Sequence, residues 1–222
     1  MCMNKSVLYS VLIAVAVCAA PLVAMADVIF NTLPEPYAIY ELPTDIPAPH
    51  SAYGDLAGNP DTYQFTLTAS TTLTFILYTL DEQDAHPIFS NIIVADEGNR
   101  GVREIDRMQA AALQWEPYQS ATTKMRYRRS EEREIDFAPG TYRVEVSTPD
   151  NVGAYRMDIH GEDTPRVGYF STLANIRAVQ SFHGYAWWHL FRTSTVLTPL
   201  LFIIVVMGML GTWWYARRHK LV

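Results

Sequence analysis

Cysteine is missing from almost all of this chain, and its absence excludes several kinds of chemistry. The 222 residues include two cysteines, Cys2 and Cys18, and both lie in an apolar N-terminal segment. Once that segment is removed, the chain has no thiol, which excludes disulfide bonds, zinc–thiolate sites and cysteine nucleophiles. The exported part must therefore be stabilised by its own hydrophobic core.

Charge of one sign is missing from each end of the chain. Residues 27–97 contain no lysine or arginine but eleven acidic residues (27, 35, 41, 45, 55, 61, 81, 82, 84, 96 and 97). After Asp163 there is no acidic residue, whereas six are basic (166, 177, 192, 217, 218 and 220). The negative first part disfavours binding to nucleic acid, and the positive last part suits an anionic membrane surface. Ordinary solvation explains the acidic part as well, but it explains the acid-free end less well.

Catalytic motifs are also missing. The six histidines (50, 86, 160, 183, 189 and 219) form no HxH or HExxH arrangement, and no GxSxG occurs. We therefore expect no enzyme activity and no catalytic residues; an enzyme of an unrecognised type is the third hypothesis.

One long hydrophobic run lies near the C-terminus, from Val196 to Tyr215, and it carries no charge. A helix of this length spans the roughly 30 Å hydrocarbon core of a bilayer. Trp213 and Trp214 at its end are typical of an interfacial aromatic belt, and three cations follow at Arg217, Arg218 and Lys220. The positive-inside rule then predicts a cytoplasmic tail over 216–222 and places the body of the chain outside the cytoplasm. A buried core helix is the alternative.

The N-terminus has the pattern of a secretory signal peptide over residues 1–26. Lys5 precedes an apolar run from Val7 to Val23, and Ala24-Met25-Ala26 forms a cleavage site. Cleavage would start the mature chain at Asp27. An uncleaved signal anchor is the alternative, and both interpretations export the same domain.

Short alternating segments indicate strands between the two apolar segments. Polar and apolar residues alternate in segments that begin at Tyr63, Thr141 and Ala154, whereas 73–78 and 88–95 are more continuously apolar, as in buried strands. Gly, Pro and Asn turns separate them. We predict an antiparallel, jelly-roll-like β-sandwich over 27–163. Six prolines in 27–60 predict an extended wrap there with short edge pieces such as 37–41, and no central strand.

Residues 103–133 interrupt the strand rhythm and read as a surface insertion. Helix formers between Ile105 and Trp115 make a short helix one interpretation of this stretch. Trp115 and Tyr118 are candidates for a partner or glycan surface, although packing of Trp115 on the core is the more ordinary explanation.

Calcium is the one cofactor that the sequence offers ligands for. Asp81, Glu82 and Asp84 supply hard oxygen donors in one loop. The spacing is not that of an EF-hand, and a solvated acidic loop is the more ordinary explanation. No other cofactor is expected.

Four segments resemble a known family. These are DTYQFTLTA at Asp61 to Ala69, Leu73 with its flanking threonines, APGTYRVEV at Ala138 to Val146, and GAYRM at Gly153 to Met157. Together, over about residues 55 to 160, they resemble the bacterial pre-peptidase C-terminal domain. The resemblance implies a small jelly-roll-like sandwich that binds or assists rather than catalyses. Some members of that family bind calcium, but their ligands do not align with residues here.

Residues 164–195 connect the sandwich to the predicted anchor. Aromatic residues, including Trp187 and Trp188, and scattered arginines favour an interfacial amphipathic helix lying on the bilayer. Packing of this helix on the sandwich is the alternative.

Taken together, these features predict a single-pass protein of the cell envelope. It would have a signal peptide (1–26), an exported sandwich (27–163), an interfacial helix (164–195), a transmembrane helix (196–215) and a tail (216–222). Its expected partners are membrane lipid and another envelope protein, in a subunit or adaptor role without catalysis. The alternative is a ligand-binding domain for calcium or cell-wall glycan.

Overall fold

The computed structural model describes residues 27–30, 38–43, 49–81, 90–96, 101–109, 112–161 and 168–219. The predicted signal peptide lies outside these residues. The chain forms two compact units, a β-sandwich within residues 25–120 and 125–167 and a helical unit that includes residues 168–219.

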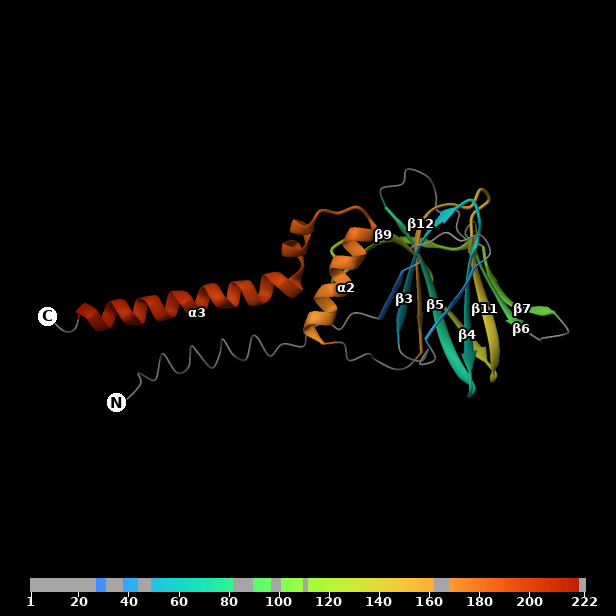
Figure 1. Cartoon of the computed structure of the whole chain (residues 1–222), viewed down its shortest axis with the longest axis horizontal. Helices are drawn as coiled ribbons and strands as arrows, with labels where there is room; N and C mark the ends of the chain where they lie inside the picture. The colour runs from blue at the N-terminus through green and yellow to red at the C-terminus, as the bar shows by residue number, and fades with distance from the viewer. Residues whose placement is uncertain are drawn as a thin grey trace. The chain divides into compact units, whose positions relative to one another are not determined.

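The first layer of the sandwich is a seven-stranded sheet (Figure 1). Its path runs β1–β3–β12–β5–β9–β8, and β10 also pairs with β5. The strands are β1 (Asp27–Phe30), β3 (His50–Ala57), β5 (Thr71–Leu80), β8 (Trp115–Gln119), β9 (Arg126–Ser130), β10 (Arg133–Phe137) and β12 (Val152–His160).

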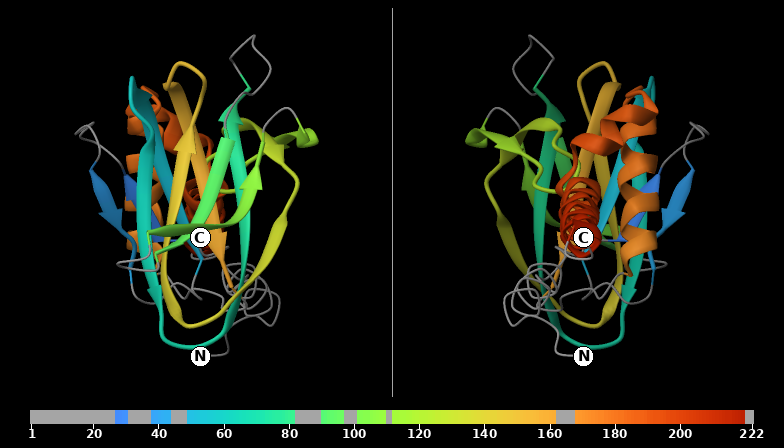
Figure 2. Two further views of the ribbon diagram at one scale, coloured as in Figure 1. Left: turned by 90° about the vertical axis from the view of Figure 1, so that its right-hand side faces the viewer. Right: turned by 90° about the vertical axis from the view of Figure 1, so that its left-hand side faces the viewer.

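The second layer is a five-stranded sheet in the order β2–β4–β11–β6–β7. Its strands are β2 (Ile39–Glu41), β4 (Asp61–Leu67), β6 (Ser90–Asp96), β7 (Val102–Met108) and β11 (Gly140–Ser147). The left view of Figure 2 looks onto this layer, and the right view looks from the side of the seven-stranded sheet. The predicted fold class, a mainly β sandwich with an apolar C-terminal helix, is confirmed.

Two edge pairs depart from the antiparallel rule. β1 pairs in parallel with β3, and β2 pairs in parallel with β4, whereas the other pairs are antiparallel. β2 is the edge piece that the proline-rich stretch predicts. β3 is an interior strand between β1 and β12, so the prediction that residues 27–60 contribute no central strand was wrong. The reason is that the prolines flank 50–57 and none lies within it.

The core lies between the layers and is built by alternation. In β4 and β11 the buried and the more exposed residues follow one another along most of the strand, so one side of each strand faces inward. The fully buried side chains include Tyr63, Phe65, Leu77, Ile93 and Met157. β5 is buried over seven successive residues, as its continuous apolar run predicts.

The stretch 103–133 is largely β structure. Ile105 lies in β7, which pairs with β6, so the short helix considered there was wrong for this residue. Pairing with a neighbouring strand outweighs the local preference of a few helix formers. Trp115 begins β8, and Pro117 lies within it. β8 is the last strand on the path of its sheet, where a missing N–H is tolerated.

Within residues 168–219, the helical unit contains α2 (Tyr169–Phe182), the 3₁₀ helix η3 (Trp187–Arg192) and α3 (Ser194–His219). The predicted single interfacial helix is thus two short helices. Gly184 ends α2 with a positive φ of 74°. Its N–H donates to the carbonyl of Ser181, and that of Tyr185 donates to Gln180. This pattern is a Schellman cap, in which glycine avoids the strain of a left-handed backbone.

Candidate functional site

α3 is long and apolar enough to cross a membrane. The candidate span covers Ser194–Tyr215, with a mean hydropathy of 2.2, and little of it is buried. A core helix of a soluble protein would be covered by other residues, so the exposure of these apolar side chains favours a lipid environment. Pro199 is the sixth residue of α3, so its missing N–H deprives the Thr195 carbonyl of its donor within the helix.

The C-terminal end of α3 pairs tryptophan with arginine. The guanidinium carbon of Arg217 lies 5.0 Å from the centre of the Trp213 ring, and that of Arg218 lies 3.9 Å from Trp214. These cation–π contacts join the predicted aromatic belt to the cations that follow the hydrophobic run. Lys220, the third predicted cation, lies outside the described residues.

A second group of exposed aromatic residues precedes α3. Trp187 and Trp188 of η3 are 61% and 54% exposed, and Phe191 is 48% exposed. Trp187 packs edge-on against both other rings, with centroid distances of 6.3 and 5.8 Å. Such an exposed cluster is typical of a surface that meets lipid or another protein. Both side chains are exposed, as a membrane contact would require, and the contact that the sequence predicts for Trp187 and Trp188 stays a prediction.

Hydrogen bonds from two side chains of α2 to backbone carbonyls connect α2 to the chain that leads into α3. The hydroxyl of Tyr169, the first residue of α2, donates to the carbonyl of Thr195 over 3.1 Å. Near the other end of α2, the Arg177 guanidinium donates to the carbonyl of Tyr185 over 3.1 Å. η3 therefore runs back along α2, and the first turns of α2 and α3 lie together.

The two aromatic candidates in the sandwich are only partly exposed. Trp115 packs against the hydrophobic core. Tyr118 contacts the Tyr78 ring at a centroid distance of 5.4 Å, and the Arg129 guanidinium lies 5.8 Å from the Tyr118 ring centre. Both side chains thus have internal contacts, and no contact described here tests a partner or glycan surface.

One residue of the predicted calcium loop is described. Asp81 faces Arg128, with 3.4 Å between Oδ1 and Nε. Glu82 and Asp84 lie outside the described residues. Among the residues that the structure describes, no three His, Cys, Asp or Glu side chains are grouped so as to hold a metal ion. The calcium site therefore stays a prediction.

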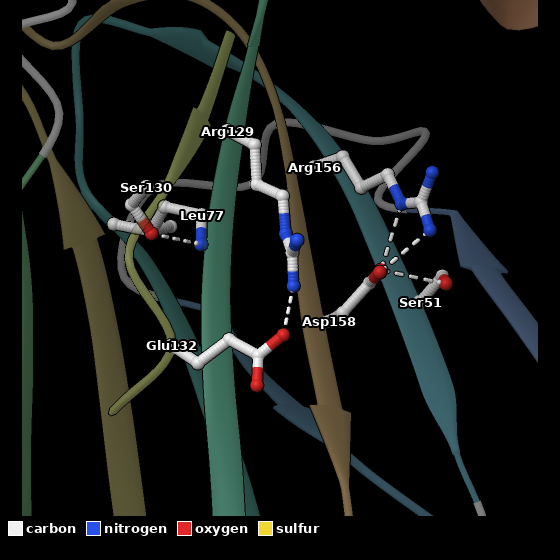
Figure 3. Close-up of polar contacts among 7 residues, drawn as sticks. All are labelled: Ser51, Leu77, Arg129, Ser130, Glu132, Arg156 and Asp158. Carbon is white, nitrogen blue, oxygen red and sulfur yellow. Dashed lines mark hydrogen bonds and ion pairs between the residues drawn. The ribbon is translucent and has the colours of Figure 1, made fainter. Parts of the chain in front are cut away.

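A polar cluster that the sequence analysis missed lies across β3, β12, β5 and β9. We call Ser51, Tyr53, Tyr78, Tyr127, Arg156 and Asp158 the tyrosine–arginine cluster. Arg156 Nε and Nη2 donate to Asp158 Oδ1 and Oδ2 over 2.7 and 2.5 Å, and the Ser51 hydroxyl donates to Oδ1 over 2.7 Å (Figure 3). The pair is largely buried, with 12% and 13% of the two side chains exposed.

Tyrosine rings surround the Arg156 guanidinium. Its central carbon lies 4.5 Å from the Tyr78 ring centre and 5.7 Å from those of Tyr53 and Tyr127. The register explains this arrangement, because Arg156 is directly opposite Tyr53 on one neighbouring strand and Tyr78 on the other. The opposite charges of Arg156 and Asp158, two residues apart on one strand, were the signal in the sequence.

The electrostatics of the cluster favour a fixed, neutralised site. Burial alone would lower the pKa of Arg156, but the Asp158 carboxylate holds that pKa well above its ordinary value. Burial raises the pKa of Tyr53, against the opposing effect of Arg156, and burial also raises the pKa of Tyr78. These phenols stay protonated at neutral pH, so they are not general bases. The cluster joins four strands, and the Ser51 hydroxyl within it donates to Asp158.

Known proteins resemble the chain in fold only. No protein-family model and no curated protein matches it. The pre-peptidase C-terminal domain of collagenase from Bacillus anthracis is 14% identical, with a TM-score of 0.35, over 58% of this chain and 98% of that one. The periplasmic g-type lysozyme inhibitor PliG of Aeromonas hydrophila is 9% identical, with a TM-score of 0.35, over 60% of this chain and 97% of that one.

A third solved structure is the surface-associated copper-binding protein CorA of Methylomicrobium album BG8. It is 10% identical, with a TM-score of 0.31, over 56% of this chain and 98% of that one. The chain thus resembles a solved pre-peptidase C-terminal domain, as its sequence motifs predict. Similarity at these identities concerns the fold, and no functional residue is transferred.

Proposed function

We propose that the chain is a single-pass membrane protein whose β-sandwich is a non-catalytic interaction module outside the cytoplasm. The observation that carries this proposal is α3, an exposed apolar helix of membrane-spanning length that follows a folded sandwich. A helix of this kind is stable in lipid because its interior backbone groups are paired within the helix, apart from the Thr195 carbonyl, which lacks a donor at Pro199 and accepts from Tyr169.

The basic end of α3 supports the proposed orientation. Arg217 and Arg218 follow the span, and the stretch before it contains Arg192 but no cluster of cations. Cations near a span are enriched on the cytoplasmic side. The C-terminus is therefore proposed to be cytoplasmic, and the sandwich periplasmic or extracellular.

The internal use of polar side chains supports a binding role rather than catalysis. Asp158 is paired with Arg156, Asp61 accepts from Tyr155, and Asp106 is paired with Arg133. Each of these carboxylates holds two strands together or stabilises a buried group, and Asp158, which accepts from the Ser51 hydroxyl, is neutralised by Arg156. We propose that the sandwich binds another envelope protein, so that the chain is a subunit or adaptor of a membrane assembly.

Cysteine labelling tests the orientation directly, because Cys2 and Cys18 are the only native cysteines. In a background with both replaced by serine, Val152→Cys places a thiol on the exposed start of β12, and Val222→Cys places one at the C-terminus. A membrane-impermeant maleimide should label V152C in intact cells and V222C only after permeabilisation. The reverse pattern would refute the orientation.

The native mass of the full-length protein tests the interaction role. The protein should be extracted from its own membranes in mild detergent and its mass measured by light scattering, with the detergent contribution subtracted. We expect a complex heavier than one chain of 25.1 kDa, with a second polypeptide in constant ratio. A monomer or a homodimer alone would contradict the subunit role and leave the anchor intact.

A further inference from the structure

The hydrogen bond between Tyr169 and Thr195 places the beginning of α2 beside the beginning of the membrane-spanning segment. Thr195 is the second residue of α3, and the span begins at Ser194. The Tyr169 hydroxyl reaches the Thr195 carbonyl over 3.1 Å. The first turn of α2 therefore lies within the length of one tyrosine side chain of the first turn of α3. In a bilayer, the depth of one turn limits the depth of the other.

Phe170 is the most exposed large apolar side chain at this point. It is 82% exposed, although it lies in the same turn as Tyr169. At 100° per residue, Phe170 and Ser181 lie on one side of α2, about 16 Å apart along its axis. Between them on that side are Ala174 and Arg177. Large apolar contact on this side is therefore confined to the N-terminal end.

The apolar stripe of α2 is on the opposite side. Ile176 and Val179 are fully buried and lie roughly opposite Phe170 around the helix. A helix that lies flat on a bilayer exposes a continuous apolar face along its length. α2 has none on its exposed side, so its geometry differs from the flat interfacial helix that the sequence predicted.

Four exposed aromatic residues lie on α2 and η3, the two helices that precede the span, and we call them the aromatic collar. They are Phe170, Trp187, Trp188 and Phe191. η3 leads directly into α3, because the carbonyl of Thr193 accepts from Leu197 in the first turn of α3. The collar and the apolar surface of α3 are therefore continuous in the chain. No acidic residue occurs from 164 onward, which suits anionic headgroups.

We propose that the aromatic collar is embedded in the interfacial layer of the outer leaflet, with α2 anchored there by Phe170 at its N-terminal end only. The partner of this surface is the boundary between headgroups and acyl chains. Indole and phenyl rings are stable at that boundary because their apolar faces leave water while their edges remain near it. The inference rests on the proposed membrane anchor.

Nitroxide depth measurements test the collar in the full-length protein, reconstituted in vesicles of phosphatidylcholine and phosphatidylglycerol. With Cys2 and Cys18 replaced by serine, single labels are introduced by Phe170→Cys, Ser181→Cys and Gly208→Cys. Gly208 lies within the span and has open space where a side chain would be. For each label, the collision rate with oxygen, which partitions into lipid, is divided by that with a water-soluble nickel chelate.

The highest ratio is expected at position 208, an intermediate one at 170, and a several-fold lower one at 181. Ser181 is the matched control, because it lies on the same side of α2 at its other end. Equal, low ratios at 170 and 181 with a high ratio at 208 would refute the collar and leave the anchor standing. Equal, high ratios at 170 and 181 would refute anchoring by one end. A low ratio at 208 would refute the anchor itself.

A second variant separates lipid contact from a folding defect. Tyr169→Phe removes the hydroxyl that bonds to Thr195 and keeps the ring. In the pair Y169F/F170C, the oxygen-to-nickel ratio at 170 is expected to fall toward that at 181, with far-ultraviolet circular dichroism unchanged. An unchanged ratio would show that the hydrogen bond does not set the depth of Phe170, and would overturn that part of the inference.

Discussion

The phenol oxygens of Tyr63 and Tyr155 lie 2.7 Å apart in the core and join the two sheets of the sandwich. The Tyr155 hydroxyl donates to Asp61 Oδ2 over 2.7 Å. Because a phenol carries one proton, Tyr63 is the donor to Tyr155. This chain of hydrogen bonds is the polar counterpart of the apolar contacts between the layers.

Replacing Tyr155 by Phe should therefore destabilise the fold more than replacing Tyr63. Tyr155→Phe removes two hydrogen bonds and takes one buried partner from Asp61, at a cost of about 1–3 kcal/mol in unfolding free energy. Tyr63→Phe keeps the bond to Asp61 and should cost about 1 kcal/mol. Urea unfolding of the full-length protein in detergent, followed by circular dichroism, checks the order. The reverse order would contradict this bonding direction.

Alkaline pH should unfold the sandwich. Burial is the main cause that raises the pKa of Tyr63, Tyr155, Tyr53 and Tyr78 above the ordinary value of 10.0. A raised pKa in the folded state means that these phenols keep their protons after the unfolded chain has lost them. The contribution of these phenols to stability is therefore constant below pH 10 and falls as the pH rises above it.

Absorbance at 295 nm, which reports tyrosinate, measures this effect. The chain has 13 tyrosines, and we expect one group to ionise near pH 10 and a second to ionise only together with the loss of circular dichroism. In guanidinium chloride all of them should ionise together near pH 10. Ionisation of every tyrosine near pH 10 in the folded protein would contradict the burial of these phenols.

The Arg156–Asp158 pair should be costly to break and cheap to replace. Asp158→Ala leaves the buried guanidinium without its carboxylate, which should cost about 3–5 kcal/mol in unfolding free energy. The double change Arg156→Met with Asp158→Leu removes both charges and should be clearly less destabilising. Thermal unfolding of the single and double variants under one detergent condition compares them. A double variant as unstable as D158A would show that the tyrosine contacts, not the charges, dominate.

Gly54 should not tolerate a methyl group. A Cβ at this position would lie 2.5 Å from ring atoms and the hydroxyl of Tyr155, which is buried and hydrogen-bonded. Gly54→Ala should therefore destabilise the sandwich by about 1–3 kcal/mol. Gly140→Ala is the control, because its Cβ would lie 3.5 Å or more from the nearest atoms of Tyr142. Equal stability of the two variants would contradict the close approach of β3 and Tyr155.

Local patterns in the sequence were enough to predict much of the fold. Alternation in 61–67, 140–147 and 152–160 marked strands whose inward residues form the core, and the uncharged run after Val196 marked α3. The strand at residues 50–57 was not predicted, because polar and apolar residues alternate only weakly in HSAYGDLA. Its place in the sheet comes from pairing with β12, about a hundred residues later.

The candidate sites show the same limit. Trp187 and Trp188 could be predicted as interfacial residues, because two adjacent tryptophans shortly before a hydrophobic run form a local pattern in the sequence. The tyrosine–arginine cluster was not, since Arg156 meets Tyr53, Tyr78 and Tyr127 only through strand register. Likewise, the bond from Tyr169 to Thr195 depends on the turn at Gly184, which no periodicity reveals.

The position of β12 has a consequence for biogenesis. β12 lies between β3 and β5, so the seven-stranded sheet lacks the strand that joins its two parts until residues 152–160 have been synthesised. β1, β3 and β5 therefore cannot form one continuous sheet while the chain is being made, until β12 follows them. Because α2 and α3 come directly after β12 in the sequence, the sheet can be completed only shortly before α3 is synthesised.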